Sequence, residues 1–191
     1  MIILYACLVL LAVNAVLPGS RLSRLGHKRW RHTWLVWLAL AVQVVVISVL
    51  PDGRGLSEAA HLWTYALAAA FVAVNHRSAG TLVIGIGGLL NLVAIAANGG
   101  VMPATRDALE ASGWEPTPGH FANSALVADP HVQFLGDVFA TPFWLPVHSV
   151  FSVGDVVIVA GFALFLHETC SAGRVDRLVP AATAESRSSA G

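Results

Sequence analysis

The sequence predicts an all-α integral membrane protein, a bundle of about five transmembrane helices. Three observations lead to this fold class: a low content of charge, five long apolar stretches, and basic residues that gather in alternate connections. Of the 191 residues, 56% are hydrophobic and only 12% are charged, whereas a soluble domain carries about 25% charged residues. So few charges cannot cover a water-facing surface, and we expect much of the surface to lie in lipid.

The five apolar stretches are long enough, or nearly so, to cross a hydrocarbon core about 30 Å thick as helices of about 20 residues. Helices are expected because backbone groups in lipid must be hydrogen-bonded within the segment. The first four are expected at residues 2–17, 34–50, 58–75 and 80–98, and the fifth ends near residue 167 after a start between residues 146 and 154. Ser57 is a suitable N-cap for the third helix.

Basic residues predict the orientation of the bundle. Nine of the eleven lie in the connections after the first and third spans and in the C-terminal tail, namely Arg21, Arg24, Lys28, Arg29, Arg31, Arg77, Arg174, Arg177 and Arg187. The other two are Arg54 and Arg106. The positive-inside rule then places the protein in the cell membrane with its N-terminus outside and its C-terminus in the cytoplasm. Trp30, Trp34 and Trp37 are expected to anchor the inner interface.

The first span has a second interpretation, a cleaved signal peptide with its cleavage site at residues 12–15. A signal peptide carries a basic region before its apolar stretch, but here nothing basic precedes Ile2 and five basic residues follow the span. The span is therefore expected to be retained, in a membrane domain of residues 1–170. Residues 171–191, rich in Ala and Ser, are expected to form a disordered cytoplasmic tail. Cys7 and Cys170, near opposite ends of the chain, are expected to be unpaired.

The longest polar stretch, residues 99–145, is expected on the outer side of the membrane. It holds five of the nine prolines and five of the eleven acidic residues. A structureless loop of this length is uncommon and usually functional. Its second half is rich in apolar residues from Val132 to Leu145. We therefore expect that half to lie on the membrane surface or to be partly re-entrant among the helices.

One face of the fourth span combines polar and small residues. Asn91 and Asn98 are seven residues apart, and Gly80, Gly87 and Ala94 recur beside them. Small residues let helices approach closely in lipid, and Asn can hydrogen-bond across the contact. This face is expected to point into the bundle, either as a packing surface or as the polar lining of a cavity.

Asp155, at the start of the fifth span, also has two interpretations. A carboxylate at mid-bilayer is a functional hypothesis by default. Yet Ser152 and Asp155 form a Ser-x-x-Asp pattern, in which Ser152 caps the helix and Asp155 lies at its positive end. Capping would not exclude a role in a site. His148, Ser152 and Asp155 could share one helix face if Pro146 opened the helix, but they would be too far apart for a catalytic triad.

Several side chains of the outer segment are of the types that bind divalent cations, namely His120, Asp129, His131, Asp137 and His148. They lack the close spacing of a motif such as His-Glu-x-x-His, so we expect solvated loop residues and predict no metal site. The sequence identifies no cofactor. The formal net charge is zero, which suggests no nucleic-acid partner.

Three short motifs fall at the outer ends of the predicted helices: NGGVMP at residues 98–103, FLGD at 134–137 and FSVGD at 151–155. With the spans around them, they resemble the bacterial DUF5317 family of multi-pass membrane proteins, over nearly the whole chain except the tail. The resemblance implies a small helical membrane bundle. It implies no activity, because the function of that family is unassigned.

These observations lead to a functional hypothesis, a polar pocket at the outer membrane face that binds or transports an ion or small solute. Asp137 and Asp155 each follow a glycine at a border between apolar and polar sequence, so we expect them to meet there. The ligand-binding candidates are Asp137, Asp155, Asn98, Asn91, Ser152 and Arg106. Two alternatives stay open: a membrane-embedded enzyme that uses the paired carboxylates, and a non-catalytic accessory subunit that packs on other membrane subunits through its small-residue face.

Overall fold

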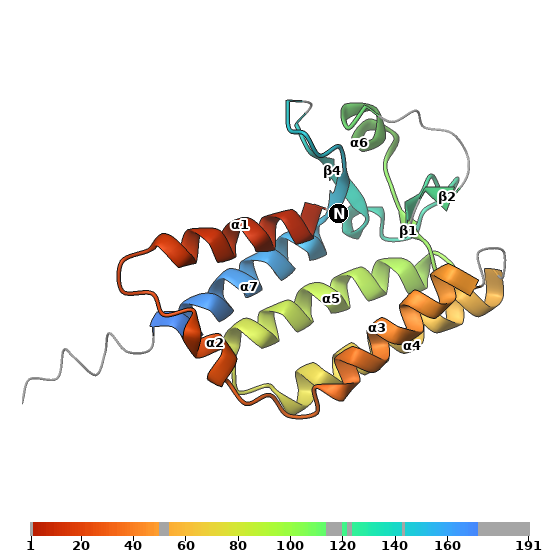
Figure 1. Cartoon of the computed structure of the whole chain (residues 1–191). Coiled ribbons are helices and arrows are strands. Elements are labelled where there is room, and N and C mark those ends of the chain that lie inside the picture. Colours follow the sequence, from red (N-terminus) through yellow and green to blue (C-terminus); the bar gives the residue numbers. More distant parts are fainter. Residues whose placement is uncertain (1, 50–53, 114–119, 122–123, 143, 172–191) are drawn as a thin grey trace, which may run out of the picture.

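The computed structural model describes residues 2–49, 54–113, 120–121, 124–142 and 144–171. Its long helices lie side by side in one bundle (Figure 1). They are α1 (Ile2–Val16), α3 (Trp34–Val49), α4 (Arg54–Val74), α5 (Ala79–Ala97) and α7 (Val153–Ser171). The short helix α2 (Ser23–His27) follows α1. The predicted tail lies outside the described residues.

The long helices coincide with the five apolar stretches, usually to within two residues at each end. Two ends differ by more. α4 begins at Arg54, so Ser57 lies inside the helix and the predicted N-cap is wrong, and α7 continues to Ser171, beyond the predicted end near residue 167. A helix can begin with a polar turn that precedes its apolar part. The apolar stretch therefore predicted the start of α4 at residue 58, four residues too late. α5 is capped by Ser78, whose hydroxyl accepts a hydrogen bond from the Thr81 amide.

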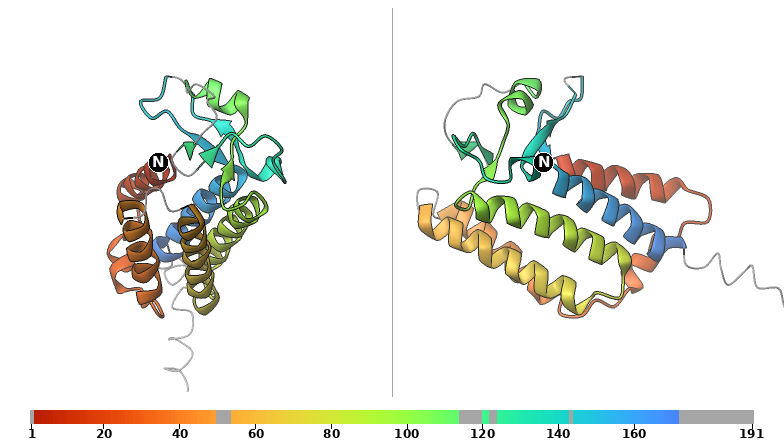
Figure 2. Two further views of the ribbon diagram at one scale, coloured as in Figure 1. Left: turned by 90° about the vertical axis from the view of Figure 1, so that its right-hand side faces the viewer. Right: turned by 180° about the vertical axis from the view of Figure 1, so that it is seen from behind.

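The helices contact one another in the order α1, α7, α5, α4, α3. The N-terminus of α1 and the C-terminus of α7 lie at opposite ends of the bundle (Figures 1 and 2). α2, the connection from α4 to α5 and the end of α7 share the end away from the N-terminus. The basic residues of the first and third connections therefore gather at one end of the molecule.

The other end carries a small cap of short elements, so the prediction of an all-α fold is wrong for this segment. The cap contains β1 (Met102–Pro103), α6 (Arg106–Ala111), β2 (His120–Phe121), β3 (Ser124–Ala125), the 3₁₀ helix η1 (Gln133–Leu135), β4 (Asp137–Ala140) and β5 (Val150–Ser152). One sheet has the order β1-β3-β2, and β4 pairs antiparallel with β5 in the other. These strands are too short for a recognisable alternation of side chains, which is why the apolar pattern did not reveal them.

The segment predicted to be re-entrant lies mainly in this cap, over the end of the bundle (Figure 1). η1 contacts α5 and α7, while β4 pairs with β5. Phe134 and Trp144 are 68% and 70% exposed, so these apolar side chains point away from the helices rather than in among them.

α5 and α7 form the closest helix pair, and the small residues make this possible. Gly80 lies against the backbone of Phe165, and Gly87 against Gly154 and Ile158. A methyl group on any of these glycines would be too close to its neighbour. The predicted inward orientation of the small-residue face is thus confirmed: Gly80, Gly87, Asn91 and Ala94 are all buried.

Two helices, α5 and α7, are long and apolar enough to cross a membrane. α1 and residues Trp63–Val74 form shorter apolar helical stretches. Large apolar side chains are exposed on all of these helices, among them Leu4, Leu8, Trp63, Ile86, Leu89 and Val156. Trp34 and Trp37 are also exposed, whereas Trp30 is half-buried and packs against Phe71 and Phe165. The anchoring role of the three tryptophans stays a prediction.

Candidate functional site

The strongest candidate site lies where the bundle meets the cap. Asp137 opens β4, and its backbone partner in β5 is Ser152. Ser152 directly precedes α7, whose first turn contains Asp155. Asn91 projects from α5, the helix packed closest to α7. Four of the six predicted candidates therefore converge here from four different elements.

Ser152 and Asp155 cap α7 in the predicted manner. The Asp155 amide donates to the Ser152 hydroxyl at 3.0 Å, and the Ser152 amide donates to the Asp155 carboxylate at 3.1 Å. This reciprocal arrangement satisfies two backbone donors that a helix start otherwise leaves free. The capping interpretation of Asp155 is confirmed.

Asn91 joins Ser152 and Asp155, at the start of α7, to α5. Its amide nitrogen donates to Asp155 Oδ1 at 2.7 Å, and its Oδ1 accepts a hydrogen bond from the Ser152 hydroxyl at 2.8 Å. Asn91 is buried and Ser152 is fully buried. Because both side chains are shielded from water, they depend on each other and on Asp155 for their hydrogen bonds.

Asp137 is the most deeply buried carboxylate described, with 5% of its surface exposed. Its Oδ2 accepts a hydrogen bond from the Ser124 hydroxyl at 2.5 Å. Its backbone carbonyl accepts from the Thr105 amide at 3.1 Å, which fixes the strand against the start of α6. Burial raises the pKa of the Asp137 carboxyl to about 6, the Ser124 hydrogen bond opposes this rise, and the charge of Asp155 adds to it.

Ser152 connects the strand of Asp137 to Asp155. Side chains of directly opposed residues in an antiparallel pair have Cβ atoms about 4.5–5.5 Å apart, and Asp137 is opposed to Ser152. Ser152 is in turn hydrogen-bonded to Asp155. Each carboxylate also lies within electrostatic range of Tyr65 of α4. The charge of Asp155 reaches Asp137, where it adds to the rise in pKa.

Two predicted site residues lie elsewhere. Asn98 caps the end of α5 and binds the backbone of His131, donating to its carbonyl and accepting from its amide, each at 2.8 Å. Arg106 is exposed at the first position of α6. Asn98 therefore ties the bundle to the cap, and no hydrogen bond joins Arg106 to the carboxylates among the described residues.

The histidines whose side chains the structure describes do not join the site. α7 begins at Val153 rather than near Pro146, so His148 and Asp155 do not share a helix face. His148 lies 3.1 Å from the carbonyl oxygen of Ser112, through its Nδ1. In the described part of the chain, no three His, Cys, Asp or Glu side chains form a group that could hold a metal ion.

Ser124 and Tyr65 are the neighbours of the carboxylates that the sequence did not single out. Ser124 belongs to a two-residue strand, paired with Met102 on one side and Phe121 on the other. A strand of two residues is too short to show the alternation of side chains by which a strand is recognised in a sequence. Tyr65 has one weak signal: it carries a hydroxyl and directly precedes the apolar run of residues 66–74 in α4.

Comparison with protein families gives one match: the model of a family of unknown function, DUF5317, matches residues 27–167. No curated protein and no solved structure matches the chain. The matched region includes every residue of the site described above.

Proposed function

Since the chain belongs to the DUF5317 family of unknown function, we infer its role from the site and propose a five-span membrane protein that binds a cation or small cationic solute between Asp137 and Asp155. The observation that carries this proposal is the pairing of two carboxylates around Ser152, one of them Asp137 at 5% exposure. No basic side chain within the described residues forms an ion pair with either carboxylate.

The surface of the bundle supports its location in a membrane. Large apolar side chains are exposed on helices all around it, and contiguous apolar surface of this kind is unusual for a protein in water. The basic residues of two connections lie at one end and the acidic, proline-rich cap at the other. By the positive-inside rule, the basic end faces the cytoplasm, and the N-terminus and the carboxylate site face outward.

Electrostatics favours a cation at this site. Two carboxylates that share a poorly solvated region repel each other, and one of them is driven to hold a proton unless a cation lies nearby. A bound cation would relieve both the repulsion and the cost of burying Asp137. The surrounding side chains offer oxygen atoms, the ligands that hard cations prefer, from Asn91, Ser124 and Ser152.

The geometry also bears on the accessory-subunit alternative. That hypothesis needs the small-residue face of α5 to be free for another subunit, but Gly80 and Gly87 are occupied by α7. The catalytic alternative gains no specific support from the geometry. Binding is therefore the function that we propose.

A cation screen tests the proposal. The purified protein in detergent micelles is heated at pH 7.5 with chloride salts of Na⁺, K⁺, Mg²⁺, Ca²⁺ or tetramethylammonium at equal ionic strength. A cation that binds the folded state raises the melting temperature in proportion to ln(1 + [L]/Kd). We expect one cation to do so for the wild type and for Asp129→Asn, an exposed carboxylate in the same cap, but not for Asp137→Asn. Equal responses of all three proteins, or no response from any, would count against the site.

A further inference from the structure

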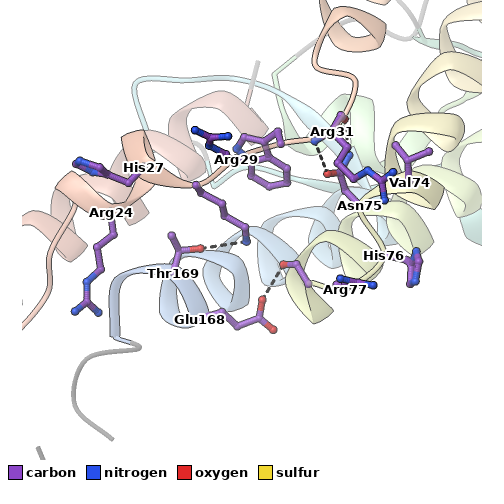
Figure 3. Close-up of a pocket in the computed structure, with 13 residues that line it drawn as sticks. Arg24, His27, Arg29, Arg31, Val74, Asn75, His76, Arg77, Glu168 and Thr169 are labelled. Atoms are coloured by element: carbon purple, nitrogen blue, oxygen red, sulfur yellow. Dashed lines mark hydrogen bonds between the residues drawn. The ribbon is translucent and has the colours of Figure 1, made fainter. Parts of the chain in front are cut away.

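A basic groove lies at the end of the bundle opposite the cap. It is an open cavity of about 680 Å³ formed by α2, the connection that follows it, the junction of α4 and α5, and the end of α7 (Figure 3). Among the described residues, five Lys or Arg side chains line it, but only one carboxylate, that of Glu168. The five are Arg24, Lys28, Arg29, Arg31 and Arg77. The groove therefore carries an excess of positive charge.

The one carboxylate is already engaged. Glu168 Oε2 accepts a hydrogen bond from the Ser78 hydroxyl at 2.8 Å, and the Gly80 amide donates to the same carboxylate at 3.3 Å. Both donors belong to the start of α5, where backbone amides leave partial positive charge. Glu168 thus compensates the partial positive charge at the start of α5, and most of the positive charge of the groove remains uncompensated.

Lys28 is held firmly against the inner wall of the groove. Its ammonium group donates to the Thr169 hydroxyl at 3.4 Å and lies 4.8 Å and 4.4 Å from the ring centroids of Trp30 and Phe165. Burial lowers the pKa of Lys28, while the charge of Glu168 opposes this change. These contacts place the ammonium group at the wall of the groove, where it adds to the positive charge.

Asn75 fixes the shape of the groove. Its Oδ1 accepts from the Arg31 amide at 3.1 Å, and its Nδ2 donates to the Arg31 carbonyl at 3.0 Å (Figure 3). This clamp joins the connection before α3 to the end of α4, 44 residues away in the chain. Residues that are remote in sequence are thus held around one cavity before any ligand arrives.

Four guanidinium groups complete the lining. Those of Arg29, Arg31 and Arg77 belong to exposed residues, and Arg24 is half-buried. Across the described residues, none of the four forms an ion pair with a carboxylate. Guanidinium groups match the oxygen geometry of phosphate with paired hydrogen bonds, and a concave surface of one sign concentrates counter-ions.

We propose that this groove binds a phosphate-bearing anion, supplied either by the head group of an anionic lipid or by a free phosphate compound. The exposed Trp34 and Trp37 follow the groove in sequence, and tryptophan is enriched at the level of lipid head groups. The lipid source rests on the membrane location proposed above, whereas the phosphate chemistry does not. Basic pockets between cytoplasmic helix ends are suited to such head groups.

Thermal unfolding of the purified full-length protein in maltoside micelles tests the proposal. The probes are inorganic phosphate, dihexanoyl phosphatidylglycerol and dihexanoyl phosphatidylcholine, each titrated at 50 mM and 500 mM NaCl. Arg77→Gln and Arg31→Gln each remove one charge from the groove. Arg21→Gln is the matched control, since Arg21 is an exposed residue of the same basic connection but does not line the cavity. Each variant is first shown to melt like the wild type without a probe.

We expect phosphatidylglycerol to raise the melting temperature more than phosphatidylcholine does, and 500 mM NaCl to reduce the effect. Arg77→Gln and Arg31→Gln should each weaken the apparent affinity about five-fold, while Arg21→Gln should leave it unchanged. Stabilisation by phosphatidylglycerol alone identifies a lipid head group, and equal stabilisation by inorganic phosphate identifies a free phosphate compound. No stabilisation by either probe, or equal weakening in Arg21→Gln, would overturn the proposal.

Failure of the carboxylate site can be told apart from failure of this groove. Asp137→Asn leaves the groove at the other end of the bundle intact, so its response to phosphatidylglycerol or phosphate should equal that of the wild type. A loss of that response in Asp137→Asn would also contradict the proposal, because it would show that the anion acts elsewhere.

Discussion

Asn91 of α5 and Asp155 of α7 are joined by a hydrogen bond of 2.7 Å between the Asn91 amide and the Asp155 carboxylate. The same Asn91 accepts a hydrogen bond from Ser152, and Ser152 caps α7, the helix whose first turn contains Asp155. One buried side chain of α5 thus binds the start of α7, and these two helices form the closest pair of the bundle. Ser152 in turn pairs with Asp137 in the cap, so this link also positions the proposed cation site.

Replacement of Asn91 by Leu tests this link. Leu has the same branching at Cγ but cannot bond to Ser152 or Asp155, so each of these two poorly solvated side chains would lose one hydrogen bond. We expect the free energy of unfolding to fall by about 1–3 kcal/mol, measured by denaturant titration in detergent micelles. Asn98→Leu should cost less, because Asn98 bonds to His131 at an exposed position, where water can replace it. Equal stability of Asn91→Leu and the wild type would contradict the role of Asn91.

Close packing of α5 against α7 predicts opposite effects for two glycine substitutions. A methyl group on Gly161 would lie 2.6 Å from the backbone nitrogen of Ile84, while one on Gly88 would meet nothing within 4 Å. Gly161→Ala should lower the free energy of unfolding by about 1–3 kcal/mol through overpacking. Gly88→Ala should be neutral, or should raise it by about 0.5–1 kcal/mol, because Ala is the better helix former. The same unfolding assay checks both, and a stable Gly161→Ala protein would refute the close approach.

The pKa of Asp137, raised from 3.8 to about 6, predicts a dependence of stability on pH. The folded protein holds this proton more tightly than the unfolded chain does, so protonation of Asp137 stabilises the fold. This stabilisation is complete below about pH 4 and is lost as the pH rises through 6. The full change is about 3 kcal/mol, at about 1.4 kcal/mol per pKa unit.

Unfolding in cation-free buffer between pH 4.5 and 7.5 measures this change. The difference in unfolding free energy between the wild type and Asp137→Asn should shift in favour of Asp137→Asn as the pH rises. Asp129→Asn, at an exposed position, should keep the wild-type slope. Parallel pH profiles for the wild type and Asp137→Asn would show that Asp137 titrates at its ordinary pKa.

The proposed orientation can be checked by cysteine labelling in intact cells. Cys7 and Cys170 are free thiols, so the test starts from a chain with Ala at both positions. Into this background Asp129→Cys places a thiol on the cap, and Arg29→Cys places one at the basic end, both at exposed positions. A membrane-impermeant maleimide should label the first in intact cells and the second only after permeabilisation. The reverse pattern would invert the orientation.

The sequence by itself determined the helical part of this protein. The apolar stretches located the five long helices because burial in lipid or in a bundle needs a continuous run of apolar residues, which is a local property. The N-cap of α7 could also be predicted from the sequence. Ser152 and Asp155 are three residues apart, and their mutual hydrogen bonds depend only on that spacing. The inward face of α5 followed from the positions of its glycines, Ala94 and Asn91.

The tertiary structure alone decided which distant groups meet. Asp137 faces Ser152 through strands of four and three residues, and Ser124 reaches Asp137 from a strand of two. Elements this short carry no periodic pattern, so their pairing depends on how the cap folds over the bundle. The basic groove has the same origin: Lys28 and Thr169 are 141 residues apart, and only the packing of α7 beside α5 and α2 brings them to one cavity.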